Sequence, residues 1–221
     1  MPRFFVPAQE IHAQFRVLTG ENAAHAKVLR LKNGDEVTVC DGCGTDYRCT
    51  VSDVAAGQIS LVVHGAAPAQ SEATVECAIY MAFAKADKFE HVIQKATELG
   101  ATELVCFPTS RCVSRPEERA LERKLERWQK IAASAAEQSR RGRIPRVLAL
   151  PSYAAALARA AKAELAVCFY ENEKSRTFRA AIEAAPFRTA ARLPGPEGGF
   201  TAEEVEQAGA AGLPICTRGT R

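Results

Sequence analysis

From residue 75 onward, short apolar runs alternate with segments of helical periodicity, and this alternation restricts the fold most strongly. The first run, 75–83, predicts a strand, and residues 88–99 after it place apolar side chains at helical spacing. Four later runs predict further strands, at 103–108, 146–150, 165–170 and 189–193. Because strands that alternate with helices pair in parallel and bury both faces, we predict an α/β domain with an open parallel sheet.

The predicted helices carry their apolar residues on single faces. The face of the helix at 88–99 comprises Phe89, Val92, Ile93, Ala96 and Leu99. A long helix is predicted to begin at the capping-box sequence Ser114-Arg115-Pro116-Glu117. Its buried stripe comprises Leu121, Leu125, Trp128, Ala132 and Ala135. Trp128 is therefore assigned to the core and not to base stacking. Shorter helices are predicted at 152–161 and 176–184.

The first seventy residues have a different pattern, which indicates a small β-barrel. Short strands separated by glycine turns are predicted at 3–6, 36–40, 47–54 and 59–64. A short helix is predicted at 21–30, and residues 66–72 have the composition of a linker. We therefore expect two domains, residues 1–70 and residues 73–221.

Basic residues are concentrated in the middle of the chain. The net charge is only +3, but residues 85–146 hold fourteen Lys and Arg against nine Asp and Glu. A basic segment on a nearly neutral protein favours a polyanionic partner, although such a run is also typical of a solvated surface. No apolar run has the length of a membrane span, and the N-terminus lacks the apolar core of a secretory signal. We therefore expect a cytoplasmic protein.

The eight cysteines are expected to be free thiols, because no secretory signal accompanies them. Cys40 and Cys43 have the spacing of a zinc or redox half-site, which Cys49 and His64 would have to complete. The same sequence is also typical of a hairpin turn between two strands, and that turn explains its glycines. We therefore predict no metal.

A glycine-rich segment follows the last strand of the predicted sheet, with the sequence Gly195-Pro196-Glu197-Gly198-Gly199-Phe200. Glycine accepts positive φ and allows the backbone to lie directly against a ligand. Thr201 and Glu204 then form a capping box that begins a helix. Because ligands of open parallel sheets bind beyond the carboxyl ends of the strands, this position predicts a small-molecule site. A tight strand-to-helix turn without a ligand explains the glycines equally well.

Five segments are similar, in order, to the motifs of one protein family. They are the start of the chain at 1–6, and residues 25–35, 95–100, 137–145 and 195–200. Each segment alone is weakly informative, but five in register across nearly the whole chain are specific. Together they resemble the RsmE family of 16S ribosomal RNA uridine-N3 methyltransferases, which belongs to the SPOUT superfamily.

The resemblance implies a PUA-like RNA-binding barrel at residues 1–70, followed by an α/β SPOUT domain with a trefoil knot at residues 73–221. It implies S-adenosyl-L-methionine as the cofactor, a uridine of small-subunit ribosomal RNA as the substrate, and a homodimer as the assembly. Family members continue with a loop and a helix that close the knot. Since this sequence ends at Arg221, we expect its closing segment to be missing.

The resemblance also assigns residues to the cofactor site, while the catalytic residue stays unassigned. The cofactor is expected to contact Glu171, Gly195, Pro196, Glu197, Gly198, Gly199 and Phe200. Because this ligand is cationic, the glycine segment supplies close backbone contact and not anion capture. Glu171 and Glu197 can orient the cofactor amine or act as the base, and ordinary loop or helix-start charges explain them equally well. The loops that carry them meet only if their strands are neighbours.

Six basic residues are candidates for contacts with RNA phosphates or with the uracil oxygens, namely Arg3, Arg30, Lys85, Arg111, Arg140 and Arg141. The cluster around Arg140 is the strongest of them. His25 is assigned to packing or hydrogen bonding in the barrel.

Two residues before the glycine segment depart from the family pattern. Pro194 stands where the family has a β-branched residue, and Arg192 places a charge in an apolar strand, which is costly if it is buried without a partner. These departures leave a second hypothesis open, a non-catalytic RNA-binding protein with a defunct methyltransferase domain. A related SPOUT enzyme acting on transfer RNA is a third, which the N-terminal barrel disfavours.

Overall fold

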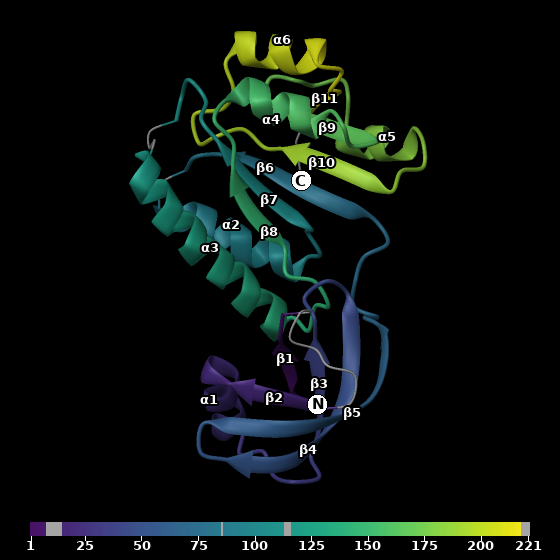
Figure 1. Ribbon diagram of the computed structural model, residues 1–221. Helices are drawn as coiled ribbons and strands as arrows, with labels where there is room; N and C mark the ends of the chain where they lie inside the picture. The colour runs from purple at the N-terminus through teal and green to yellow at the C-terminus, as the bar shows by residue number, and fades with distance from the viewer. Residues whose placement is uncertain (8–14, 85, 113–115, 218–221) are drawn as a thin grey trace. The chain divides into compact units, whose positions relative to one another are not determined.

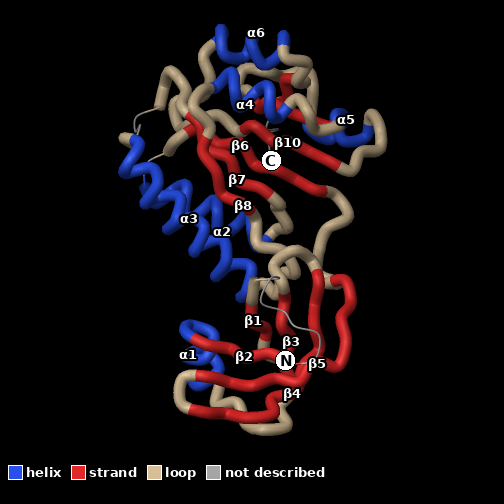
Figure 2. Tube along the Cα trace, viewed as in Figure 1, coloured by secondary structure: helices blue, strands red, loops and turns tan. Residues whose placement is uncertain are grey.

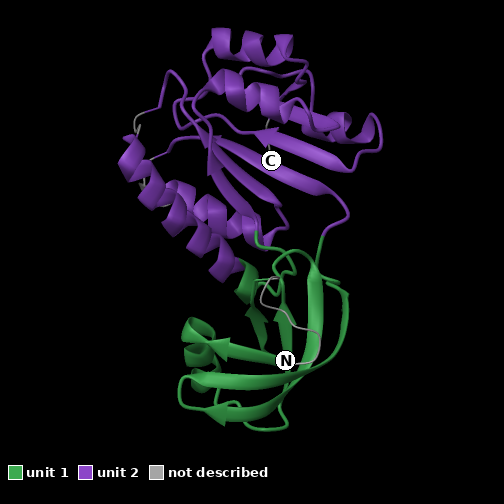
Figure 3. Ribbon diagram, viewed as in Figure 1, with its two compact units in different colours: residues 1–72, 136–144 green, residues 73–135, 145–221 purple. Residues whose placement is uncertain are grey.

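The computed structural model describes residues 1–7, 15–84, 86–112 and 116–217, and the chain forms two compact units (Figure 1 and Figure 3). The first unit comprises residues 1–72 and 136–144, and the second comprises residues 73–135 and 145–221. The sequence-based division places one boundary near residue 70, whereas residues 136–144 return to the first unit. The basic segment around Arg140 therefore belongs to the same unit as the N-terminal strands.

The first unit is a curled five-stranded sheet with one helix (Figure 2). Its elements are β1 (Arg3–Phe5), β2 (Phe15–Thr19), α1 (Gly20–Val28), β3 (Glu36–Cys40), β4 (Thr45–Ala55) and β5 (Gln58–Pro68). The strand order is β1-β3-β4-β5-β2, with β1 parallel to β3 and the other pairs antiparallel. The register of β4 on β5 shifts near Arg48 and Val51, and such bulges bend strands. The predicted small barrel is present as this half-barrel.

The sequence does not predict β2, because a charged residue occupies one of its inward positions. Arg16 is 3% exposed, whereas its neighbour Val17 is 45% exposed, so the apolar alternation of this strand is broken. The strands of the unit together build its core, which includes Phe4, Leu18, Val37, Val39, Val51 and Leu61.

A buried ion pair fixes residues 136–144 within the first unit. The side chain of Arg141 is 3% exposed, and its guanidinium donates to the carboxylate of Glu72. The Oε1 atom of Glu72 also accepts from the amides of Gly142 at 2.8 Å and Arg143 at 3.1 Å. Burial acts to raise the pKa of Glu72, but the hydrogen bonds from Arg141 and the two amides outweigh it, and the pKa is lowered.

The second unit is an α/β domain built on a six-stranded parallel sheet. Its elements are β6 (Glu76–Ala82), α2 (Ala86–Glu98), β7 (Glu103–Phe107), α3 (Glu118–Gln138), β8 (Arg146–Ala149), α4 (Tyr153–Ala160), β9 (Leu165–Phe169), α5 (Phe178–Glu183), β10 (Thr189–Leu193), α6 (Ala202–Ala210) and β11 (Ile215–Cys216). The strand order is β11-β9-β10-β6-β7-β8, and every pair is parallel. The predicted open parallel sheet is confirmed.

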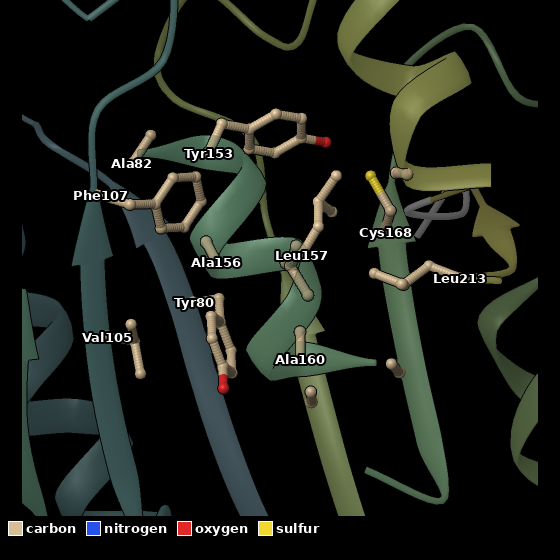
Figure 4. Close-up of a cluster of buried hydrophobic side chains, with 14 of the residues drawn as sticks. Tyr80, Ala82, Val105, Phe107, Tyr153, Ala156, Leu157, Ala160, Cys168 and Leu213 are labelled. Atoms are coloured by element: carbon tan, nitrogen blue, oxygen red, sulfur yellow. The ribbon is translucent and has the colours of Figure 1, made fainter. Parts of the chain in front are cut away.

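Helices cover both faces of this sheet, which explains why its strands read as continuous apolar runs. In β7, Leu104 and Cys106 pack with α2 and α3, while Val105 and Phe107 face α4 (Figure 4). The stripe predicted for α3 is confirmed around Trp128, whose ring lies 4.7 Å from that of Phe89 on α2. On the first face, α5 packs on the end strands β9 and β11.

Two details of the helix predictions differ from the structure or lie outside it. Leu99 was assigned to the buried face of its helix, but this assignment is wrong, because α2 ends at Glu98 and Leu99 is 86% exposed. Gly100, with φ of +99°, turns the chain immediately after it. Ser114 and Arg115 of the expected capping box lie outside the described residues.

Replacing Arg141 with Ala is expected to lower the free energy of unfolding by about 3 kcal/mol, because it leaves the partly buried Glu72 carboxylate with the two amides as donors but without its charged partner. Urea unfolding measures this change. Replacing the exposed neighbour Arg140 with Ala is the matched control and should change stability by less than about 1 kcal/mol. Equal effects of the two substitutions would contradict the assignment of Arg141 to the buried pair.

The same ion pair predicts how stability depends on pH. Because the pKa of Glu72 is lower in the folded state than in the unfolded state, the carboxylate stabilises the fold at pH values above its unfolded pKa. This stabilisation is lost as the pH falls through the folded pKa. Glu72→Gln should therefore have a flatter acid limb of stability than the unmodified chain.

Candidate functional site

The carboxyl ends of three strands of the second unit carry loops that meet. The strand β10 pairs directly with β9, so the loop after β9, which contains Glu171, lies beside the segment 195–200. The loop after β7 reaches the same segment through Arg111. The neighbouring strands on which the expected cofactor site depends are therefore present.

The segment 195–200 forms a tight turn, which we call the glycine turn. The amide of Gly199 donates to the carbonyl of Pro196 at 2.9 Å, and Gly199 has φ of +69°. A Cβ atom on Gly199 would lie 2.3 Å from Oε1 of Glu171, so the carboxylate rests directly on the glycine backbone. Glycine is needed here both for the left-handed conformation and for this close approach.

The ends of the glycine turn are held by the core and by the helix that follows. Phe200 is 1% exposed and its ring lies 5.4 Å from that of Tyr153. The capping box predicted at the start of α6 is confirmed, since Thr201 and Glu204 exchange hydrogen bonds between side chain and backbone. The tip of the turn is exposed at Glu197 and Gly198.

Two basic side chains contact the tip of the turn. The guanidinium of Arg111 donates to the carbonyl of Gly198 at 2.8 Å. The ammonium of Lys88 lies 2.9 Å from a carboxylate oxygen of Glu197, and Lys88 is largely exposed. Glu197 is thus paired at the surface, whereas Glu171 faces the backbone of the turn.

The six candidate RNA contacts fall into different environments. Arg3 pairs with Asp46 at 2.6 Å and donates to the carbonyl of Arg141, so these two arginines hold the first unit together. Arg30 and Arg140 are exposed, and Arg111 contacts the glycine turn. Lys85 lies outside the described residues.

Arg30 and Arg140 share an unusual backbone conformation. They are the non-glycine residues with positive φ in the described parts of the chain, at +55° and +58°. Each follows a helix, α1 or α3, in the position of a Schellman C-cap, where glycine is usual. These two helix ends meet, because Nδ1 of His25 lies 3.0 Å from Oε1 of Glu137. Strained residues that persist at the surface are typical of functional positions.

The two departures before the glycine turn are accommodated. Pro194 lies just beyond the end of β10 at Leu193, so it removes no hydrogen bond from the strand. Arg192 was considered as a buried charge, but it is exposed. Its guanidinium carbon lies 4.7 Å from the ring centre of Phe178 and 5.2 Å from that of Phe169. The free-energy cost of an unpartnered buried charge therefore does not arise, and the guanidinium instead makes cation–π contacts with the two rings.

The two cysteines that have the spacing of a half-site, Cys40 and Cys43, differ in their burial. Cys40 is buried and its thiol donates to the carbonyl of Gly142, whereas Cys43 is exposed. Burial raises the pKa of the Cys40 thiol to about 11. Within the described ranges, no three His, Cys, Asp or Glu side chains gather as metal ligands. None of the helices in those ranges is both long and apolar enough to span a membrane.

Comparison with known protein families assigns both units. Residues 71–221 match the RNA methyltransferase domain, and residues 18–63 match the RNA methyltransferase PUA domain. Ribosomal RNA small subunit methyltransferase E of Bacillus subtilis is 33% identical, over 94% of this chain and 84% of its own length. The protein of the same name from a Synechocystis strain is 33% identical, over 97% of this chain and 70% of its own length.

Solved structures agree with these matches. The chain superposes on ribosomal RNA small subunit methyltransferase E from Neisseria gonorrhoeae, solved bound to S-adenosyl methionine, with a TM-score of 0.86 and 27% identity. That match covers 100% of this chain and 90% of the other. A methyltransferase from Legionella pneumophila, also solved with this cofactor, gives a TM-score of 0.83 at 25% identity and covers 99% and 89%.

The fold, the glycine turn and these matches define an RNA methyltransferase with an N-terminal PUA domain. Within that class, the chain belongs to the ribosomal RNA small subunit methyltransferase E (RsmE) family.

Sequence reasoning missed two residues that support the glycine turn through Glu204. Ser110 follows β7 and donates to Glu204, and Tyr153 donates through its hydroxyl to the carbonyl of Glu204. The capping box already identified Glu204 as a helix-start residue, but its partners are distant in the sequence. The available sequence signal was position alone, since Ser110 lies just beyond β7 and Tyr153 begins α4 just beyond β8.

Replacing Gly199 with Ala is expected to lower the free energy of unfolding by about 1–2 kcal/mol, because Ala is strained at this φ and its Cβ displaces the Glu171 carboxylate. Urea unfolding measures the change. Gly198→Ala is the control, since a Cβ there would meet the Arg111 side chain at an ordinary 3.5 Å. The assignment of close approach to Gly199 fails if Gly198→Ala costs as much.

Proposed function

We propose that this protein transfers the methyl group of S-adenosyl-L-methionine to N3 of a uridine in 16S ribosomal RNA. The observation that carries the proposal is the contact of Glu171 with Gly199, at the carboxyl ends of two neighbouring parallel strands. That is where a sheet of this kind binds ligands. Membership of the RsmE family supplies the reaction class.

The residues at the glycine turn fit this cofactor. Gly195, Gly198 and Gly199 offer backbone without side chains, which suits a flat adenosine group. Pro196 and Phe200 are buried beside them and stiffen the turn. We assign Glu171 to the cationic end of the cofactor, because its carboxylate is held against the turn, and place Glu197 at the edge of the site.

The bound cofactor supplies an electrophilic methyl group on a sulfonium. In the transfer, the bond from N3 to the methyl carbon would form as the bond from that carbon to sulfur breaks, with S-adenosylhomocysteine as the leaving group and the imide proton passing to a base. The part of the protein is then to hold the base in line with the methyl group. A positioned guanidinium stabilises the negative charge that develops on the uracil oxygens, and we assign this stabilising role to Arg111.

The RNA is assigned to the first unit, with Arg30 and Arg140 as its principal contacts there. Both are exposed, and both hold a conformation that glycine would adopt at lower cost. Arg3 and Arg141 are assigned instead to positioning the segment that carries Arg140. By family resemblance we further propose a cytoplasmic homodimer with a trefoil knot in its second domain.

Calorimetry with S-adenosylhomocysteine and tritium transfer to assembled small ribosomal subunits test the reaction. We expect micromolar binding of the cofactor product by this chain and methylation that depends on the substrate subunit. Gly198→Asp is the control, because it places a carboxylate and a side chain in the cofactor contact. Cofactor binding without methyl transfer to any RNA would favour the alternative, a non-catalytic RNA-binding protein.

Replacing Arg140 with Gly is expected to weaken RNA binding while it preserves the fold, because Gly suits the positive φ. Each lost phosphate contact should flatten the slope of log affinity against log salt by about 0.7–0.9. Filter binding to a 16S ribosomal RNA fragment over a salt series measures this slope. Arg179→Ala on α5 removes an exposed charge elsewhere, and an equal change in slope for that variant would contradict the assignment.

A further inference from the structure

A carboxylate near the glycine turn is buried more deeply than helix capping requires. Glu204 is 7% exposed, although a capping box needs only one of its two carboxylate oxygens. The Oε2 atom accepts from the amide of Thr201 at 2.9 Å and completes that box. Since burying a charge is costly unless several donors compensate it, the second oxygen calls for an explanation.

The second oxygen binds the loop after β7. The Oε1 atom of Glu204 accepts from the amide of Ser110 at 2.8 Å and from its hydroxyl at 3.0 Å, across a sequence separation of 94 residues. Both donors belong to one residue, so the carboxylate holds the backbone as well as the side chain. This contact joins the N-terminal turn of α6 to the loop after β7.

The loop that Glu204 holds is a compact turn, which we call the β7 loop (Thr109–Cys112). The amide of Cys112 donates to the carbonyl of Thr109, and the amide of Thr109 donates to the Cys112 sulfur. The residue after Ser110 is Arg111, which donates to the carbonyl of Gly198. The β7 loop therefore meets the glycine turn and its helix at two points, one buried and one exposed.

We propose that Glu204 is a positioning residue that locks the β7 loop to the glycine turn, and so sets both the cofactor contact and the place of Arg111 before ligands bind. The inference rests on the proposed function. A side chain that holds two ligand-contacting loops in a single arrangement reduces the conformational entropy that those loops would lose when the ligand binds. The competing explanation is that Glu204 only caps α6 and adds stability.

The chain offers matched variants that separate these explanations. In Glu204→Gln an NH2 group, which is a donor, takes the place of one carboxylate oxygen, so the side chain loses its hydrogen bonds to either Thr201 or Ser110. Ser110→Ala removes one hydrogen bond of the lock and leaves the capping box intact. Tyr153→Phe removes the hydroxyl that donates to the carbonyl of Glu204 at 2.9 Å, keeps the ring that packs on Phe200, and leaves both hydrogen bonds from Ser110 to Glu204 in place.

Hydrogen exchange and calorimetry on the full chain test the proposal. In Glu204→Gln we expect amides of the β7 loop to exchange at least tenfold faster and the Kd for S-adenosylhomocysteine to rise at least tenfold. Ser110→Ala should raise the Kd about threefold. Tyr153→Phe should lower the Tm but change loop exchange and the Kd by less than twofold.

Loss of Tm in Glu204→Gln with unchanged loop exchange and an unchanged Kd would overturn the proposal, and Glu204 would then be a helix cap alone. Faster exchange of the β7 loop with an unchanged Kd would also overturn it, since the lock would not set the site. If the unmodified chain binds no S-adenosylhomocysteine, the proposed function fails. Loop exchange in Glu204→Gln needs no ligand, so in that case it still tests whether Glu204 holds the β7 loop.

Discussion

The parallel pairing of β10 with β9 is the constraint on which the site depends. It brings the end of one strand, where the chain must turn through Gly199, beside the end of another, which carries Glu171. Neither residue has chemical meaning alone, because an isolated glycine turn and an isolated loop carboxylate are common. Their contact combines an open backbone with a nearby carboxylate, which suits a flat, positively charged ligand. The rest of the second unit keeps these two strand ends in register.

Burial sorts the basic residues of the first unit into two groups. Arg3 and Arg141 are committed to carboxylates and to backbone inside the unit, where loss of a partner would be expensive. Arg30 and Arg140 lie at helix ends and have positive φ, which residues with a Cβ atom rarely adopt. Both are exposed to solvent. The basic residues that the sequence groups together as candidates thus divide into two that hold the unit together and two that are exposed at its surface.

Most of the fold could be predicted from local patterns in the sequence. The strands at Glu36–Cys40 and Thr189–Leu193 and the capping box at Thr201 depend on residues close together in the chain, and the structure places them as expected. The wrong assignment of Leu99 was a local error, because α2 ends at Glu98, whereas the failure to predict β2 depended on the folded sheet. The strand β2 is concealed by the inward-facing Arg16.

The candidate site shows the same division. The glycine turn could be located from its own residues, because conformational demands at Gly199 are local. Its supports could not, since Ser110 and Glu204 are joined only by the folded chain. The burial of Arg141 was likewise hidden, because its partner Glu72 lies in the segment that reads as a linker.

The return of residues 136–144 to the first unit has a consequence for biosynthesis. A nascent chain released only as far as residue 72 lacks the arginine that neutralises Glu72 and the carbonyl that Arg3 binds. The full set of contacts of the N-terminal half-barrel therefore forms only after α3 has been translated, while β8 to β11 of the second unit still have to follow.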